Sequence, residues 1–296
     1  MNEILFKLAE LKYAENSNKV NSFSFEFFPP KTKELEINLQ KSVLELAKLK
    51  PNFMTVTYGA GGSTHDKTLE TVTFIQNKVG IKAAAHITAV NSKKEEVNKV
   101  IEQYHLNNIT KVVALRGDMP GMVGKYQPTI GGYAYAKDLV SYIASLNKFE
   151  ISVAGYPETH PEAKSADEDL SFLKDKVEAG ANDIITQYCF DTDKILHYID
   201  KVRAKNINVP IIPGIMLINN FKQLKKFSDS CGASIPEWLN NLCLNIDDNH
   251  ETRFAVSVLV AYEQCKILLD AGITDFHFYS LNHYQVAMAV CHLLGI

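Results

Sequence analysis

Short runs of β-branched and aromatic residues alternate along the chain with longer stretches in which apolar residues recur at helical spacing. Each run ends in a polar or glycine-rich patch, which is typical of a strand that ends at a loop. The runs predict eight strands, at 23–27, 53–58, 82–88, 111–117, 151–156, 183–190, 209–216 and 275–282. Strands that alternate with helices predict an α/β fold with a parallel sheet.

The stretches between the runs carry the signals of helices. In residues 167–181, Leu170, Leu173 and Val177 fall on one apolar stripe. Glycine often ends a helix, and three glycines follow helical stretches and precede strands: Gly80, Gly180 and Gly272.

Eight is the number of strands at which a parallel sheet can close, so we predict a single (β/α)8 TIM barrel over residues 1–296. Residues 1–20 mix apolar and charged positions, which predicts an amphipathic helix packed on the barrel rather than a signal peptide. The interval 217–274, between the seventh and eighth strands, is long enough for about three extra helices. A doubly wound open sheet is the alternative. It is less favoured because the glycine-rich stretch 59–64 lacks the GxGxxG spacing.

Composition narrows the class of protein. The chain of 296 residues has a formal net charge of −3, so no basic field favours nucleic acid or an anionic membrane as a partner. No apolar run is long enough to cross a bilayer. The five cysteines form no CxxC pair, which argues against a disulfide framework or a zinc site and fits a reducing cytoplasm. We expect Cys189 to be packed rather than reactive.

Polar residues collect at the carboxyl ends of the predicted strands, where a barrel carries its active site. Each has an ordinary structural explanation when taken alone, but their joint placement at one end favours an active site. The chain also has 13 Tyr and 15 Phe, which suits a flat ligand held by stacking with a few polar anchors. The residues concerned include Glu26, Thr57, Tyr58, His86, Arg116, Gly117, Asp118, Tyr156, His160, Gln187, His277 and Tyr279. The histidines show no metal-ligand spacing, so we predict no metal site.

Glu26 lies among phenylalanines in the segment SFSFEFFPP. Side chains of a strand alternate between two faces, so Phe25 and Phe27 share one face while Ser24 and Glu26 share the other. With helices outside the barrel, the phenylalanines should pack outward and Glu26 should point into the site.

Eight blocks in order give the chain a resemblance to bacterial methylenetetrahydrofolate reductase over nearly its whole length. They are FSFEFFPPKT, VTYGAGGS, AAHIT, VALRGD, VAGYPETHPEAKS, ITQYCFD, IPGIM with NFKQLKKF, and DFHFYSLN. The resemblance implies a barrel that binds FAD without a Rossmann fingerprint. It implies that NADH or NADPH reduces the flavin, which then passes hydride to 5,10-methylenetetrahydrofolate. A cytoplasmic homo-oligomer with no nucleic-acid or membrane partner would fit this family.

Site roles follow from the resemblance residue by residue. Glu26 matches the general acid that protonates the folate and opens its five-membered ring to an iminium, and Asp118 matches the carboxylate that stabilises this cation. A general acid needs a raised pKa, for which the bound flavin and folate would supply the low-dielectric surface. Substrate contacts match Thr57, Gln187, Gln223, Phe227 and His283. FAD contacts match Tyr58, Ala60, His86, Arg116, Gly117, Asp118, Ala136, Tyr156, His160, Ala163, Asp169 and Lys176.

The chain departs from the family pattern at several positions. His283 stands where an arginine contacts substrate, so the contact with the folate tail should be weaker. Leu217 stands where proline is commoner, which should relax the loop after the seventh strand. The loop 118–133 is longer than in some members. Two other functions remain open: a different barrel enzyme of one-carbon chemistry, such as a corrinoid-dependent methyltransferase, and a catalytically silent binding subunit. Retention of Glu26 argues against the latter.

Overall fold

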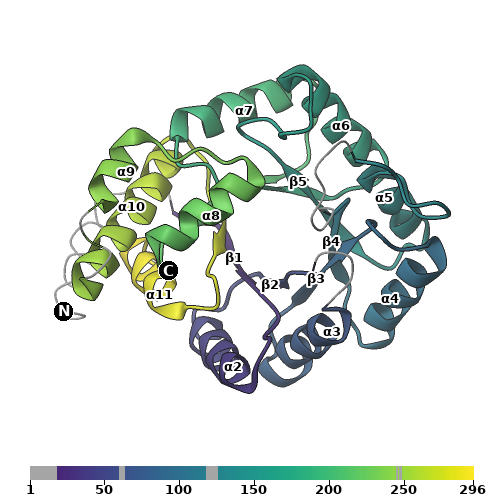
Figure 1. Ribbon diagram of the computed structural model, residues 1–296, viewed down its shortest axis with the longest axis horizontal. Coiled ribbons are helices and arrows are strands. Elements are labelled where there is room, and N and C mark those ends of the chain that lie inside the picture. Colours follow the sequence, from purple (N-terminus) through teal and green to yellow (C-terminus); the bar gives the residue numbers. More distant parts are fainter. Residues whose placement is uncertain (1–18, 60–63, 118–125, 245, 247–248) are drawn as a thin grey trace.

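The computed structural model describes residues 19–59, 64–117, 126–244, 246 and 249–296. Its parallel strands form one sheet in the order β7-β6-β5-β4-β3-β2-β1-β9-β8. The strands are β1 (Ser22–Phe27), β2 (Phe53–Val56), β3 (Ala83–Thr88), β4 (Lys111–Leu115), β5 (Glu150–Gly155), β6 (Asp183–Thr186), β7 (Ile211–Ile212), β8 (Gly214–Met216) and β9 (Asp275–Tyr279). Figure 1 shows the strands around a centre with helices outside them, which confirms the predicted TIM barrel.

The seventh predicted strand, 209–216, is two strands rather than one. The outer strands of the sheet order, β7 and β8, are consecutive in the chain and meet at Pro213. Proline has no backbone N–H and cannot donate to a strand ladder. β7 therefore pairs with β6, β8 pairs with β9, and the carbonyl of Pro213 accepts a hydrogen bond from the backbone of His277 at 2.9 Å.

Helices surround the sheet (Figure 1). They are α2 (Lys33–Ala47), α3 (His65–Thr73), α4 (Lys94–Leu106), α5 (Ala136–Ser145), α6 (Ala166–Glu178), α7 (Thr192–Ala204), α8 (Phe221–Cys231), α9 (Glu237–Cys243), α10 (His250–Asp270) and α11 (Tyr284–Leu293), with a π-helical segment (Phe74–Val79) after α3. Three helices, α8 to α10, fill the interval 217–274 as predicted. The predicted N-terminal helix falls almost entirely outside the described residues.

Local signals begin and end these helices. The side chains of Thr32, Ser165 and Asn220 each accept a hydrogen bond from a backbone N–H in the first turn of α2, α6 and α8. Gly80 follows the π-helical segment with a φ of 79°, in the left-handed region that glycine adopts at little cost.

Two apolar layers fix the position of the site. Outside the strands, Phe25 and Phe27 are fully buried in a core that includes Leu39 and Val43 of α2. Inside the barrel, a smaller cluster fills the lumen below the site: Phe53, Ala84, Val113, Ile185 and Ile212. The lumen is therefore closed at depth, and polar inward residues gather near the carboxyl ends of the strands, which we call the mouth. No helix in the described part of the chain is long and apolar enough to cross a membrane.

Candidate active site at the barrel mouth

Glu26 occupies the position that the alternation of β1 predicts. Strand pairing sets it beside Thr55 of β2 on one side and Tyr279 of β9 on the other. Its neighbours Phe25 and Phe27 are buried on the helix side of the strand. Glu26 itself is 9% exposed, so a carboxyl group lies almost out of solvent on the lumen side.

Three polar side chains converge on one oxygen of this carboxyl group. His86 Nε2 lies 3.3 Å and His277 Nε2 lies 3.4 Å from Glu26 Oε2, and the hydroxyl of Thr55 donates to the same oxygen at 3.4 Å. The approach of His86 is an electrostatic contact without hydrogen-bond geometry, because its Nε2 has no hydrogen-bond partner and is buried. The carboxylate therefore has two imidazoles as neighbours.

These neighbours determine the charge of Glu26. Burial favours the protonated form, but the nearby imidazoles of His86 and His277 outweigh it and lower the pKa of Glu26 to about 2. The raised pKa that a general acid needs is therefore not a property of this chain by itself, and the expectation that bound flavin and folate raise it stays a prediction. Glu26 is ionised at neutral pH in this state.

A second group of predicted residues is cationic. The guanidinium of Arg116 makes two hydrogen bonds to Glu162 and lies 4.3 Å from the ring centroid of Tyr126. The ammonium group of Lys176 donates to the carbonyl of Ala154 at 2.6 Å. Burial lowers the pKa of Lys176 to about 8, since a charge there loses hydration. An anionic group placed beside Lys176 would offset that loss.

His160, Tyr156 and Asp169 form a local structure next to this group. The ring of His160 meets the ring of Tyr156 edge-on at 4.6 Å, and the backbone N–H of His160 donates to the carboxylate of Asp169 at 3.0 Å. Burial and the charge of Arg116 lower the pKa of His160. Asp169 therefore fixes the loop after β5, in addition to any contact with a ligand.

Gly117 joins β4 to the mouth in a conformation that a side chain would disturb. Its φ is +86°, and a Cβ would lie 2.6 Å from Val90 Cγ1 and 2.8 Å from Thr88 Cβ. Both the positive φ and the close packing against the end of β3 therefore favour glycine here.

A small cavity at the mouth brings Tyr156 and Gln187 together, with Tyr188 and Cys231 among its other lining residues. Gln187 is half-buried, and its side-chain oxygen accepts from the backbone of Tyr188 at 3.1 Å. Cys189, next in sequence, is 1% exposed and burial raises the pKa of its thiol to about 12, which confirms that it is packed.

An aromatic pair joins α8 to the mouth. The ring of Phe227 stacks on that of Phe28 at 6.2 Å between centroids. Asn282 holds Phe28 by two hydrogen bonds to its backbone, at 2.8 and 2.9 Å. Gln223, one helical turn before Phe227, is exposed.

The remaining predicted residues occupy several places. Thr57 and Tyr58 follow β2 and are half-buried, Ala136 begins α5, Ala163 lies in the loop before α6, and His283 is exposed immediately before α11. Ala60 and Asp118 lie outside the described residues. The expected loosening at Leu217 is wrong, because Leu217 is buried and its N–H donates to the carbonyl of Tyr279 at 3.4 Å. A proline could not make that bond.

Comparison with known proteins decides the family. The model of the methylenetetrahydrofolate reductase family matches residues 11–295. This chain belongs to the methylenetetrahydrofolate reductase family. It is 44% identical over 283 residues to the 5,10-methylenetetrahydrofolate reductase of Escherichia coli (strain K12), covering 96% of this chain and 93% of that protein. Against the Arabidopsis thaliana protein named methylenetetrahydrofolate reductase (NADH) 1, it is 41% identical over 93% of this chain and 48% of that protein.

Solved structures support the fold of this methylenetetrahydrofolate reductase family member. A Clostridium thermocellum protein described as binding two copies of 5-methyl-5,6,7,8-tetrahydrofolic acid superposes with a TM-score of 0.60 at 16% identity, over 97% of this chain and 98% of that one. An oxaloacetate acetylhydrolase superposes with a TM-score of 0.52 at 11% identity, over 96% and 82%. At these identities the likeness shows a shared barrel and nothing of chemistry.

The sequence did not indicate two contacts of the site. Ser24 Oγ lies 2.7 Å from His277 Nδ1, and Glu162 pairs with Arg116. The alternation that placed Glu26 also put Ser24 on the inward face, but it gave no sign of the contact between Ser24 and His277. Glu162 lies in a loop whose path no periodic pattern predicts.

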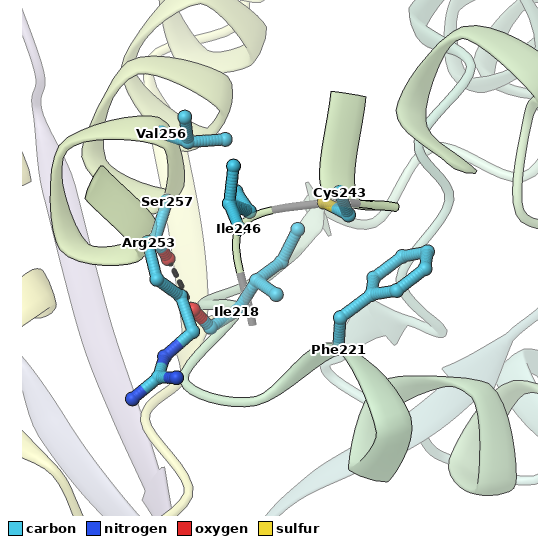
Figure 2. A pocket seen from close by; sticks show the side chains of 7 residues that line it. All are labelled: Ile218, Phe221, Cys243, Ile246, Arg253, Val256 and Ser257. Atoms are coloured by element: carbon cyan, nitrogen blue, oxygen red, sulfur yellow. Dashed lines mark hydrogen bonds between the residues drawn. The ribbon is translucent and has the colours of Figure 1, made fainter. Parts of the chain in front are cut away.

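A second cavity lies among α8, α9 and α10 (Figure 2). Its lining is mainly apolar, with Ile218 and Phe221 prominent, and the hydroxyl of Ser257 donates to the carbonyl of Ile218 at 2.5 Å. The guanidinium of Arg253 points away from Phe221 in Figure 2. This cavity reflects the packing of the extra helices rather than a polar site. Among the residues that the structure describes, no group of three or more His, Cys, Asp or Glu side chains could hold a metal ion.

Proposed function

We propose that this protein reduces 5,10-methylenetetrahydrofolate to 5-methyltetrahydrofolate, with NADH or NADPH as electron donor, FAD as carrier and Glu26 as general acid. The observation that carries the proposal is the nearly buried carboxyl group of Glu26 at the mouth of a barrel of this family. Burying an ionised carboxyl group costs free energy because ions are poorly solvated there, so its presence at the mouth favours a functional role.

The residues present fit a flavin dinucleotide. Arg116 and Lys176 supply positive charge that suits a pyrophosphate, and the lowered pKa of Lys176 indicates a cation without a sufficient counter-ion in the protein alone. His86 Nε2 is a buried polar atom without a hydrogen-bond partner, facing the lumen beside Glu26. We assign Arg116, Lys176 and His160 to the phosphate end of FAD, and Tyr58 and His86 to its ring end. When bound, FAD would supply a two-electron carrier between the two substrates.

The substrate side of the proposal depends on Glu26. Protonation of the folate N10 by Glu26 breaks its bond to the bridging carbon, and the resulting N5 iminium accepts hydride. Asp118, outside the described residues, would stabilise this cation. The stacked rings of Phe227 and Phe28 offer an apolar surface beside the mouth, and Gln187 offers an amide to the pterin.

The test is a pair of half-reactions on the purified protein. Protein reconstituted with FAD is mixed anaerobically with NADH or NADPH, and bleaching of the flavin absorbance is followed by stopped flow. The reduced protein is then mixed with 5,10-methylenetetrahydrofolate, and reoxidation is followed together with formation of 5-methyltetrahydrofolate. We expect both half-reactions. A protein that binds no FAD, or that turns over methyl groups only with a corrinoid, would overturn the proposal and favour the methyltransferase.

If the protein binds FAD but shows neither half-reaction, a catalytically inactive binding subunit is favoured instead. Light scattering on the same preparation measures the oligomeric state, for which we propose a homo-oligomer.

A further inference from the structure

A line of polar contacts runs from Ser24 through His277 to Glu26. Ser24 Oγ lies 2.7 Å from His277 Nδ1, and His277 Nε2 lies 3.4 Å from Glu26 Oε2. Strand register makes this arrangement, because Ser24 pairs with His277 and Glu26 with Tyr279 across β1 and β9. Both Ser24 and His277 are at most 1% exposed, so the line is closed to solvent at its inner end.

The hydroxyl of Ser24 also lies within 3.4 Å of a backbone acceptor, the carbonyl of Phe276. If Ser24 donates its proton there, its lone pairs face His277 Nδ1 and favour a proton on that nitrogen. Nε2 is then the nitrogen that can exchange a proton with Glu26.

The chemistry of the proposed function requires a proton that Glu26 alone does not hold. A general acid must be protonated when substrate arrives, yet the surroundings lower the pKa of Glu26 to about 2. A nearby group must therefore keep the proton that Glu26 delivers.

We propose that His277 is that group: one proton is shared between His277 Nε2 and Glu26 Oε2, and Ser24 fixes the imidazole that holds it. This inference rests on the proposed function of the site. The proton moves from the imidazolium Nε2 to Oε2, which leaves a neutral imidazole and a carboxylic acid. A half-turn about the Cγ–Cδ bond presents the acid to the folate, and N10 takes the proton as its bond to the bridging carbon breaks. A proton from solvent then recharges the pair through Glu26, its more exposed member.

Among the side chains around Glu26, His277 is the best placed to hold the proton. Thr55 and Tyr279 carry hydroxyl groups that are neutral at physiological pH, and burial raises the pKa of Tyr279 further. His86 is the other imidazole, but its approach to Oε2 lacks hydrogen-bond geometry. Of the two imidazoles, His277 is the one whose other ring nitrogen, Nδ1, contacts a further side chain, that of Ser24.

The substitution His277→Gln tests the proposal, because an amide can donate a hydrogen bond to Glu26 but cannot store a proton. The control is His197→Gln, the same change at an exposed position of α7. We expect the folate half-reaction of FAD-loaded H277Q to fall by about 10²-fold, with NADH reduction within about threefold of wild type. The rate of the folate half-reaction in H277Q should fall about tenfold for each unit of pH across the neutral range. The same rate in wild type should change little until the pH is high enough to remove the shared proton.

Nuclear magnetic resonance of ¹⁵N-histidine-labelled protein provides a readout independent of activity. The His277 signals are those missing from H277Q, and we expect both ring nitrogens to be protonated at pH 7. Ser24→Ala serves where H277Q does not fold, with an expected loss of about tenfold in the folate half-reaction only. An unprotonated Nε2 at pH 7 would overturn the inference, as would an H277Q enzyme with the rate and pH profile of wild type. Equal loss of both half-reactions would show a purely structural role and also overturn it.

The failure of the proposed function looks different. Wild-type protein that lacks the folate half-reaction overturns both the function and this inference. If wild type is active and H277Q has the same rate and pH profile, the inference alone is overturned.

Discussion

The guanidinium of Arg116 and the carboxylate of Glu162 form a two-bond ion pair at the mouth of the barrel. Arg116 follows β4 and Glu162 lies in the loop after β5, so the pair links two neighbouring strand ends. The Arg116 side chain is 18% exposed and that of Glu162 is 49% exposed. A ligand phosphate that binds Arg116 must therefore share the guanidinium with Glu162 or displace it.

We expect Glu162→Gln to tighten FAD binding by about threefold to fivefold, because it removes a competing negative charge from a partly exposed pair. The dissociation constant is measured by quenching of flavin fluorescence on titration with apoprotein. Glu178→Gln, at an exposed position of α6, is the control and should change nothing. Weaker binding in E162Q would show that Glu162 holds Arg116 in place for the ligand.

Lys176 gives a prediction in which stability and binding change in opposite directions. Its pKa is lowered to about 8 from an ordinary value of 10.5, so between these values the unfolded chain binds more protons than the folded one. The free energy of unfolding of wild type should therefore rise from pH 8 to about pH 10 on account of this group. Below pH 8 the folded protein bears the full cost of the buried charge.

Lys176→Met should remove this pH dependence, raise the midpoint of urea unfolding at pH 7, and weaken FAD binding by at least tenfold. The matched control is Lys174→Met on the same helix, where the side chain is 40% exposed. A K176M protein that keeps wild-type FAD affinity would remove Lys176 from the phosphate site.

The sequence predicted the barrel and the inward direction of the Glu26 side chain, because both follow from patterns that repeat over short stretches of the chain. Alternation over β1 separates Phe25 from Glu26, and the repeat of strand and helix gives the closure. The break at Pro213 was also readable in principle, since proline cannot donate to a ladder. The run of apolar residues around it nevertheless resembled one continuous strand.

Contacts between distant segments could not be predicted in the same way. Ser24 and His277 are 253 positions apart, and their contact depends on the register of β1 against β9. The pKa of Glu26 depends on His86 and His277 together. The sequence places each of these residues on an inward face, but their distances require the closed barrel.

Gly117 tests how tightly the end of β4 packs on β3. We expect Gly117→Ala to lower the free energy of unfolding by about 3 kcal/mol, from a strained positive φ together with crowding against Val90. Gly80→Ala is the control, since Gly80 has a φ of +79° but no atom within 4 Å of an added Cβ. It should lose only about 1 kcal/mol. Equal losses in urea unfolding would show that the backbone conformation, and not the contact with Val90, sets the requirement.

Glu26→Gln separates the proposed acid from the other roles of the site. The amide keeps the size of the side chain but cannot donate an acidic proton, so we expect the folate half-reaction to fall by about 10²–10⁴-fold. Reduction of bound FAD by NADH needs no proton from Glu26 and should stay within about threefold of wild type. Stopped flow on the two half-reactions measures both rates on one preparation. Loss of both to the same degree, with FAD still bound, would mean that Glu26 shapes the site rather than delivering the proton.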